Sequence, residues 1–260
     1  MVEQDEGAGR SLRVAMTVEA QESERRQGVI DLFALVLAGG KGERLRPLTA
    51  DRPKPMVPVG DKPILQHHLE WLAGNGVSDV VLLCGYKHEA IEAYFGDGER
   101  LGLRIRYSIE DSPLGRGGAF RRGFQQVPAS EKTVIGTNGD NIVEQPLAPL
   151  LRRHRRSHAV ATVMLAPLRS PYGVVRLSRG SRVLGFEEKP LLPYWVNAGV
   201  YALEREFFAM LPEVGDHETT VFPELASQGR LFGFRSDAYW KPIDTVKDVT
   251  EAAAHLAGRG

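Results

Sequence analysis

A glycine-rich segment that follows an apolar run has the residue types needed to bind a polyanion. The run Leu35–Leu37 leads into Ala38, and glycine then occupies positions 39, 40 and 42. Glycines at the end of a strand let backbone N–H groups approach an anion, because no Cβ stands in the way. Two cations follow, Arg44 inside the loop and Lys54 ten residues on. A polyphosphate uses both kinds of group, so these residues indicate a phosphate site.

Two familiar phosphate-binding patterns do not match this loop. No Gly-Lys-Ser/Thr closes it, as a P-loop requires, and its glycines are not spaced as in the dinucleotide-binding fingerprint. Glycines after a strand, taken alone, favour a plain tight turn. Arg44 and the segment Pro53–Pro55, which carries Lys54, shift the balance toward a nucleotide site.

A carboxylate follows another strand-like run. Asp140 comes after residues 133–137 through Asn138 and Gly139. Mg²⁺ prefers oxygen ligands and keeps several waters, so a carboxylate that faces a triphosphate is suited to hold it. The alternative is an Asx turn that only caps the strand, and the residues alone leave both interpretations open.

Strand-like and helical runs alternate through the first half of the chain, which predicts βαβ units and a parallel sheet. The expected strands are residues 32–37, 80–84, 103–109 and 133–137, and the expected helices are residues 63–73, 89–95 and 118–127. Open sheets of this kind bind ligands at the carboxyl ends of their strands. Gly39, Gly40 and Asp140 all follow such ends, so we expect them on one rim of the sheet.

The regular alternation of strands and helices ends at about Pro146. The expected elements are a basic helix at 150–158, strands at 160–165, 196–203 and 231–235, a β-ribbon made of 173–177 and 183–186, and helices at 218–227 and 245–256. No repeat and no Pro/Ser-rich linker divides the chain. We therefore expect one domain over residues 32–260, with halves at about 32–145 and about 146–260. Residues 1–31 are expected to form a disordered N-terminal extension.

Composition argues against several classes of protein. The 260 residues carry 33 basic and 33 acidic side chains, so global charge gives no reason to expect a nucleic-acid partner. The run 152–156 is densely basic but lacks interleaved aromatics, and we interpret it as a solvated helix face. Cys84 is the single cysteine, which favours a reducing, cytoplasmic location, and no apolar run is long enough to span a membrane.

The glycine loop and Pro53–Pro55 together resemble the signature of the sugar-1-phosphate nucleotidyltransferases (NDP-sugar pyrophosphorylases). Similar motifs recur in the family's order at 138–140, 186–190 and 196–201, so the resemblance runs from about Leu32 to about Leu256. It implies an α/β protein with a Rossmann-like three-layer αβα fold. It also implies a mixed, mainly parallel central sheet, with a small β-ribbon in the half that binds the sugar phosphate.

The resemblance further implies an enzyme that uses Mg²⁺ to transfer a nucleotidyl group from an NTP to a sugar 1-phosphate, with release of pyrophosphate. The motifs are most similar to mannose- and heptose-1-phosphate guanylyltransferases, which favours GTP. A hexose-1-phosphate enzyme that uses CTP, UTP or dTTP is the alternative. We expect a monomer or a small homo-oligomer.

Two further alternatives come from other classes of protein. One is a regulatory or nucleotide-sugar-binding module that keeps the fold without activity, although Arg44, Lys54, Asp140 and Lys189 are all present. The other is a glycosyltransferase of related fold, which would use an Asp-x-Asp motif, and none occurs near Asp140.

The resemblance assigns the nucleotide contacts residue by residue. Arg44 would contact the leaving pyrophosphate and Lys54 the α-phosphate, as the two catalytic side chains. The implied nucleotide-binding set is Leu37, Ala38, Gly39, Gly40, Lys41, Gly42, Arg44, Lys54, Arg116, Gly117 and Gly118. Arg116 stands where relatives carry Thr, and three roles stay open for it: contact with the triphosphate, a hydrogen bond to a guanine edge, or exposure to water.

The resemblance implies that the metal lies between Asp140 and a second carboxylate near the C-terminus. Many relatives have Trp-x-Asp-Ile-Gly there, but the position of their Asp is Pro242 in this chain, and proline cannot coordinate a cation. The form Trp-x-x-x-Asp-Thr is similar to glucose-1-phosphate cytidylyltransferases, which assigns the second ligand to Asp244. Asp248 is expected to be an acid in the first turn of a helix.

The sugar-phosphate contacts are likewise implied by the resemblance. Lys189 would bind the phosphate of the sugar 1-phosphate, and Glu188 and Asn197 would bind sugar hydroxyls. The remaining members of this set are Gly139, Tyr172 and Gly173. By itself, a Glu-Lys pair such as Glu188-Lys189 is more often a solvated surface pair.

Overall fold

A computed structural model describes residues 32–258, so the expected extension at residues 1–31 lies outside the described part of the chain. The central sheet has seven strands in the order β12-β8-β11-β6-β1-β4-β5. Their bounds are β1 Leu32–Leu37, β4 Val77–Cys84, β5 Arg104–Ile109, β6 Thr133–Asn138, β8 Ala161–Arg169, β11 Leu191–Glu204 and β12 Leu231–Arg235. Strand β11 runs antiparallel to both of its neighbours, and the other four pairings are parallel. The expectation of a mixed, mainly parallel sheet is confirmed.

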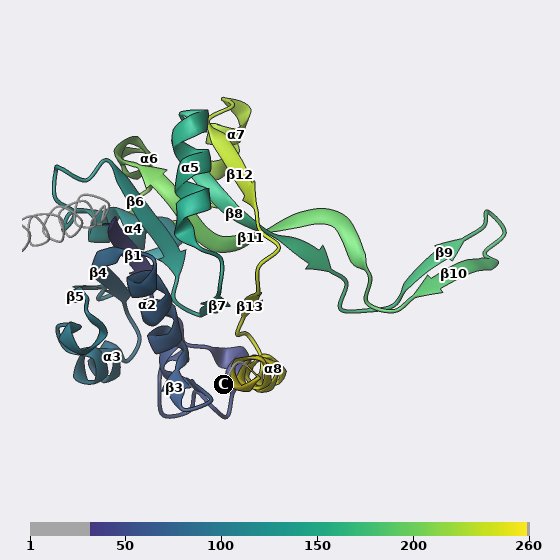
Figure 1. Cartoon of the computed structure of the whole chain (residues 1–260), viewed down its shortest axis with the longest axis horizontal. Coiled ribbons are helices and arrows are strands. Elements are labelled where there is room, and N and C mark those ends of the chain that lie inside the picture. The colour runs from purple at the N-terminus through teal and green to yellow at the C-terminus, as the bar shows by residue number, and fades with distance from the viewer. Residues whose placement is uncertain (1–31, 259–260) are drawn as a thin grey trace, which may run out of the picture.

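Helices cover both faces of this sheet (Figure 1). Side chains of a strand alternate between faces, so Ala34 and Val36 of β1 join one core cluster while Phe33 and Leu35 join another. The first cluster receives α2 (Ile64–Gly74), α3 (His88–Phe95) and α5 (Leu147–Ser157). The second receives α4 (Gly115–Phe124), α6 (Arg205–Ala209) and α7 (Val221–Ser227). The result is the expected three-layer αβα arrangement.

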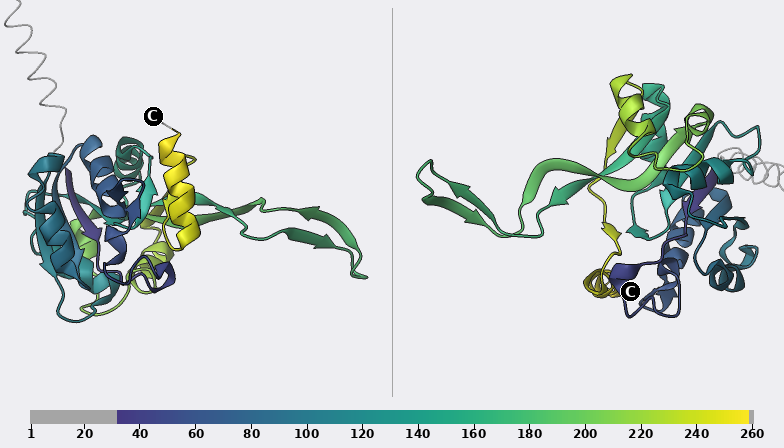
Figure 2. Two further views of the ribbon diagram at one scale, coloured as in Figure 1. Left: turned by 90° about the horizontal axis from the view of Figure 1, so that it is seen from below. Right: turned by 180° about the vertical axis from the view of Figure 1, so that it is seen from behind.

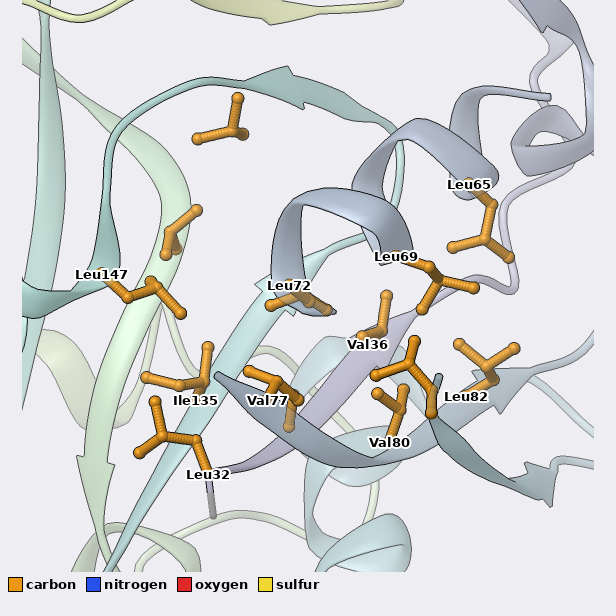
Figure 3. Packing of buried hydrophobic residues seen from close by; sticks show 14 of the residues in the cluster. Leu32, Val36, Leu65, Leu69, Leu72, Val77, Val80, Leu82, Ile135 and Leu147 are labelled. Carbon is orange, nitrogen blue, oxygen red and sulfur yellow. The ribbon is translucent and has the colours of Figure 1, made fainter. Parts of the chain in front are cut away.

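Helix α2 owes its place to the spacing of its apolar residues. Leu65, Leu69 and Leu72 recur at intervals of four and three, so they share one face of the helix and point onto the sheet (Figure 3). There they meet Val36 of β1 and Val80 of β4, both fully buried. Figure 3 shows these side chains in one continuous layer between the helix and the strands.

A third, smaller core cluster joins the segment that follows β1 to the last helix of the described chain. Helix α8 (Val246–Ala257) packs on η1 (Glu43–Leu45) and β2 (Pro58–Val59) through this third core cluster, which includes Leu45, Val59, Ile243 and Ala252. The short strands β13 (Trp240–Pro242) and β7 (Asn141–Val143) pair antiparallel, with Pro242 opposite Asn141. This pairing brings the residues after Pro242 to the loop that carries Asp140.

The predicted β-ribbon is present, but it stands away from the rest of the protein. Strands β9 (Val174–Leu177) and β10 (Val183–Glu187) form a two-stranded sheet of their own. Figures 1 and 2 show it at the end of a long extension of β8 and β11, remote from the layered body. We call residues 170–190 the arm.

Several element boundaries differ from the expected ones. Helix α4 begins at Gly115 rather than 118 and ends at Phe124, α5 begins three residues early, and α7 begins at Val221. Strand β11 starts at Leu191 because it continues into the base of the arm, where Leu191 pairs with Arg169. Apolar periodicity did not mark these ends, because loop contacts decide them.

A buried histidine is expected to make the folded protein less stable in acid. The His217 ring is 0% exposed, and its neighbours are the rings of Phe120, Tyr201, Phe207 and Phe222. Neither ring nitrogen has a hydrogen-bond partner among the described residues. Burial lowers the pKa of His217 from 6.5 to about 4. The unfolded chain therefore takes up this proton first, and stability falls as pH drops from about 6.5 toward 4.

We expect His217→Phe to lose less stability in acid than the wild type. Between pH 7.5 and pH 5 this one group should cost the wild type on the order of 2 kcal/mol, and the variant should be spared that cost. Urea unfolding of both proteins at the two pH values measures it. An equal loss in both proteins would show that His217 is not buried in its neutral form.

Candidate functional site

Two carboxylates and one ammonium meet at the rim of the sheet. Lys54 Nζ donates to Asp140 Oδ2 at 2.7 Å and to Asp244 Oδ1 at 2.8 Å. Arg44 Nη2 lies 3.0 Å from the same Oδ1 of Asp244. These four residues come from three distant segments: the loop after β1, the turn between β6 and β7, and the link from β13 to α8. The pairing of β7 with β13 is fixed further by the Ile243 N–H, which donates to the carbonyl of Asp140 at 3.1 Å.

Lys54 is held in its charged form. Its side chain is only 10% exposed, whereas that of Arg44 is 73% exposed. Burial opposes the charge on Lys54, but the charges and hydrogen bonds of Asp140 and Asp244 outweigh burial and raise its pKa. Lys54 is thus a fixed point charge at the site, and Arg44 is a mobile one above it.

The carboxylate pair has the donor chemistry of a divalent cation site. One ammonium nitrogen contacts an oxygen of both Asp140 and Asp244, so both oxygens also lie within reach of one cation. Mg²⁺ is commonly held by one or two carboxylates together with substrate phosphates and waters. No group of three or more His, Cys, Asp or Glu side chains suited to a metal occurs within residues 32–258. The residues therefore fit a metal that is shared with a phosphate ligand.

Asp248 has a different role. It accepts the N–H and the hydroxyl of Thr245 at 2.8 Å each, and its own N–H donates to the Thr245 hydroxyl, which is a capping box at the start of α8. Its other oxygen lies 2.8 Å from Lys241 Nζ. The expectation of an acid in the first turn of a helix is confirmed, and the capping box is a further role that the structure adds.

The loop after β1 is folded to expose its amides. Gly42 has φ 68°, and a Cβ there would come within 2.8 Å of Lys54 Cβ, so only glycine fits. The Lys54 N–H donates to Gly40 O, and Thr49 Oγ1 donates to Gly42 O, so the loop carbonyls are occupied. The N–H groups of Gly39, Gly40 and Lys41 form no hydrogen bond with residues 32–258. They remain available to an anion.

A cavity of about 360 Å³ opens beside this loop. It reaches the candidate metal ligand Asp140 and lies at the carboxyl ends of β1, β4 and β6, where a parallel sheet binds ligands. Its lining residues are Leu37, Gly39, Gly40, Leu83, Glu110, Pro113, Gly115, Arg116, Ala119, Asn138 and Asp140.

Two polar lining residues, Glu110 and Asn138, were not among the site residues predicted from the sequence. Glu110 follows β5 and accepts the N–H of Leu114 through one oxygen at 3.1 Å, while a Cβ on Gly85 would come within 2.8 Å of the other. Asn138 has a buried Oδ1 without a partner in the described part of the chain. Glu110 directly follows β5, and Asn138 is the last residue of β6. This position at the end of a strand was the only signal in the sequence that could have identified them.

Arg116 is tied to the opposite wall of the site. Its Nε donates to Asp216 at 2.7 Å, and its Nη1 donates to Glu218 at 2.6 Å. The two carboxylates outweigh partial burial and raise the pKa of Arg116. None of the three roles left open included this pairing.

Asn197 joins the same network. Its Nδ2 donates to Glu218 Oε1 and to the Tyr201 hydroxyl, both at 2.9 Å, and its Oδ1 accepts the N–H of Gly199. Asn197 is therefore linked to Arg116 through the shared carboxylate of Glu218.

Gly117 and Gly118 pack against backbone. The Gly117 N–H donates to Gly215 O at 2.9 Å, and a Cβ at Gly117 would lie 3.1 Å from that oxygen. A Cβ at Gly118 would overlap Glu213 O. Close approach of α4 to the loop before α7 accounts for both glycines, and neither lines the cavity.

A buried histidine fixes the turn that carries Asp140. Burial lowers the pKa of His68 to about 4, so its ring is neutral and has one N–H. The Asn141 carbonyl lies 3.1 Å from Nδ1, and the Thr137 hydroxyl lies 3.0 Å from Nε2 and donates its own proton to the Gly199 carbonyl at 2.9 Å. His68 thereby connects α2 to both sides of Asp140.

Four of the predicted sugar-phosphate residues lie on the arm. Tyr172 and Gly173 precede β9, and Glu188 and Lys189 follow β10. Lys189 Nζ is 3.9 Å from its neighbour Glu188, and both side chains are at least half exposed. The structure does not bring them to Asp140. Gly139, in contrast, directly precedes Asp140 in the turn after β6 and packs against β1, where a Cβ would come within 2.9 Å of Val36.

Known proteins share this sequence over almost its whole described length. The sequence profile of the nucleotidyl transferase family matches residues 33–259. The chain belongs to the nucleotidyl transferase family. A mannose-1-phosphate guanylyltransferase of Mycobacterium tuberculosis is 38% identical over 231 residues, which cover 86% of this chain and 64% of that protein. A D-glycero-alpha-D-manno-heptose 1-phosphate guanylyltransferase of Aneurinibacillus thermoaerophilus is 37% identical over 228 residues, which cover 86% and 97%.

Other similar proteins have a different nucleotide in their names. A UTP–glucose-1-phosphate uridylyltransferase of Synechocystis is 31% identical over 246 residues, which cover 87% of this nucleotidyl transferase and 63% of that protein. The chain thus spans somewhat less than two thirds of the mycobacterial and Synechocystis relatives, and nearly all of the Aneurinibacillus one.

Solved structures have the same fold. HddC from Yersinia pseudotuberculosis superimposes with a TM-score of 0.71 at 24% identity, over 86% of this chain and 99% of that one. A putative glucose-1-phosphate thymidylyltransferase from Bacillus anthracis gives 0.70 at 22% identity, over 86% and 94%. These likenesses confirm the nucleotidyltransferase fold. Of the helices within residues 32–258, none is both long and apolar enough to cross a membrane.

Proposed function

We propose that this nucleotidyl transferase moves a nucleotidyl group from an NTP to a sugar 1-phosphate and releases pyrophosphate. The observation that carries the proposal is the contact of Lys54 with both Asp140 and Asp244 beside a loop with three free amides. A cation-binding carboxylate pair, a fixed ammonium and an amide cradle are the groups that a phosphoryl-type displacement needs. Such a reaction depends mainly on alignment and on neutralising charge.

Each group has a role in this proposal. The amides of Gly39, Gly40 and Lys41 bind phosphate oxygens, and exposed Arg44 follows the leaving pyrophosphate. Lys54 stabilises charge on the α-phosphate. A divalent cation, proposed to be Mg²⁺, would be held by Asp140 and Asp244 and would neutralise phosphate charge when bound. His68 keeps the turn of Asp140 in place.

GTP and a mannose- or heptose-type sugar 1-phosphate are the proposed substrates. The guanylyltransferases named above, at 38% and 37% identity, support this choice, and the uridylyltransferase at 31% makes UTP the nearest alternative. Glu110 also fits, because a carboxylate in the cavity can accept the N–H groups of guanine.

A substrate panel tests the proposal. Purified protein with Mg²⁺ is assayed for pyrophosphate release with GTP, ATP, CTP, UTP and dTTP against mannose, glucose and heptose 1-phosphates. We expect release that requires both substrates and is fastest with GTP. If no pair supports release while GTP binds, the chain is an inactive nucleotide-binding module.

The pairing of Arg116 leads to a separate prediction. Because its guanidinium is shared by Asp216 and Glu218, we expect it to hold the cavity wall in place rather than to select a base. Arg116→Thr should raise KM for all NTPs by a similar factor, roughly three- to tenfold, since a partly exposed ion-pair network is worth about 1 kcal/mol. Arg122→Thr, on the same helix with only a distant carboxylate at 3.9 Å, is the control.

Steady-state kinetics with GTP, CTP and UTP measure the effect on both variants. A change in the ratio of kcat/KM between nucleotides would contradict this role and would show that Arg116 reads the base.

A further inference from the structure

The arm has one apolar face that nothing in the described chain covers. Val175 pairs with Phe186, and Leu177 pairs with Val183. Paired residues share a face, as do residues two apart on one strand, so all four side chains lie together. Their exposed fractions are 42%, 67%, 58% and 57% in that order. The opposite face of the ribbon is polar, because Arg176 faces Gly185 there.

An isolated two-stranded ribbon is at best marginally stable in water. The base of the arm is nevertheless ordered by hydrogen bonds: Ser170 N–H donates to Pro190 O at 2.9 Å, and Arg169 donates to Lys189 O at 2.9 Å. The apolar face is therefore held out from the body as a fixed element, and it requires a partner surface.

The arm does not reach the site of its own chain. The Ala198 carbonyl accepts from the side chain of Asn141, next to Asp140, which locates Ala198 at the site. Strand β11 runs from there to Leu191, where it still pairs with Arg169 of β8. Seven residues of strand at about 3.3 Å each put Leu191 about 20 Å from Ala198, and Lys189 lies beyond it. Figures 1 and 2 show the arm leading away from the body.

The charge of the arm is complementary to the charge of the nucleotide site. The site carries five carboxylates, Glu110, Asp140, Asp216, Glu218 and Asp244, against three cations, Arg44, Lys54 and Arg116. The arm has four basic side chains, Arg176, Arg179, Arg182 and Lys189, against two acidic ones, Glu187 and Glu188, and no acid lies between residues 170 and 186. None of these three arginines forms an ion pair with residues 32–258. The arm is basic where the site is acidic.

The available area is also sufficient for a dimer. Tyr172, Phe186 and Tyr194 are 76%, 67% and 65% exposed. An aromatic side chain can bury roughly 150–250 Å², so these three offer roughly 300–500 Å² per chain. In a reciprocal exchange each copy both gives and receives an arm, so the area buried on each copy is twice as large. It then approaches the value of about 800 Å² per partner that is typical of a stable interface.

We infer that the arm docks on a second copy of this chain, with its apolar face against that copy's body and its basic residues at that copy's nucleotide site. The exchange is reciprocal, as two-fold symmetry requires. Lys189 then binds the sugar phosphate in the partner's site; this role of Lys189 rests on the proposed function. Each site is then complete only in the dimer.

The mass of the protein in solution tests the docking. We expect a dimer of about twice 28.7 kDa by sedimentation at micromolar concentration. Phe186→Asp should raise its dissociation constant at least tenfold, because aromatic anchors dominate interfaces. Val174→Asp puts an acid on the opposite face, at a position outside the basic set, and should leave the mass unchanged. A monomeric wild type, or a Phe186→Asp variant that dimerises like the control, would overturn the inference.

Mixing two variants tests the shared site. Lys189→Ala and Asp140→Asn should each be nearly inactive alone. Mixed dimers combine one intact body with one intact arm, so the mixture should recover about a quarter of wild-type activity. Mixed dimers without recovery, or an active Lys189→Ala variant, would show that Lys189 does not act on the partner. If the wild type itself releases no pyrophosphate, the proposed function fails, and the sedimentation result alone decides whether the arm docks.

Discussion

Lys54→Ala should lower kcat about 10²- to 10³-fold while the protein stays folded. Lys54 is a buried donor fixed between Asp140 and Asp244 before any substrate binds. Removing one such preorganised charge from a displacement at phosphorus typically costs this much. Lys54 also occupies the place where a cation would contact the two carboxylates, so its loss should lower the Mg²⁺ concentration needed for half-maximal activity.

Steady-state kinetics at several Mg²⁺ concentrations, with circular dichroism to check folding, measure both effects. Lys62→Ala is the matched control, because Lys62 pairs with Glu70 on the surface, away from the carboxylate pair. If the Lys54 variant retained more than about a third of wild-type kcat, Lys54 would have no part in the chemistry.

Asp140→Asn and Asp244→Asn should both lower kcat strongly and raise the Mg²⁺ requirement. Each change removes one of the two carboxylates that converge on Lys54 Nζ, and a hard divalent cation depends on that charge. We expect at least a tenfold increase in the half-saturating Mg²⁺ concentration, with a smaller change in the affinity for the nucleotide.

Asp248→Asn is the control for these variants. Asp248 lies four residues from Asp244 but caps α8, so its change should cost about 1 kcal/mol of stability and leave the Mg²⁺ titration as in the wild type. Crippled activity in the Asp248 variant, together with a normal titration of Asp244→Asn, would move the second ligand to Asp248.

The sequence predicts the sheet well because its strands bury both faces. Strand β1 is wholly apolar and β4 ends in the apolar run 80–84, and glycine follows soon after each; β6 is only partly apolar, but Asn-Gly-Asp marks its end. Strand-end position then places the glycine loop and Asp140 on one rim, as the structure has them. The capping role of Asp248 also follows from local spacing, since Thr245 is three residues before it.

Contacts between segments that are distant in the chain could not be predicted from the sequence. Arg116 pairs with carboxylates 100 and 102 residues away, which no local pattern encodes. The strands β7 and β13 have three residues each, too few for a periodic signal, yet their pairing places Asp244 beside Asp140. Alternation predicts the ribbon at 173–186 but not its direction. The projection of the arm depends on how β8 and β11 extend beyond the sheet.

Phosphorus NMR of a single reaction tests the proposed transfer most directly. The protein is mixed with GTP, mannose 1-phosphate and Mg²⁺, and the products are followed with time. Transfer at the α-phosphorus predicts pyrophosphate and a sugar nucleotide in equal amounts, and neither in the Asp140→Asn variant. Release of GDP and inorganic phosphate, or pyrophosphate without a sugar nucleotide, would contradict nucleotidyl transfer to the sugar phosphate.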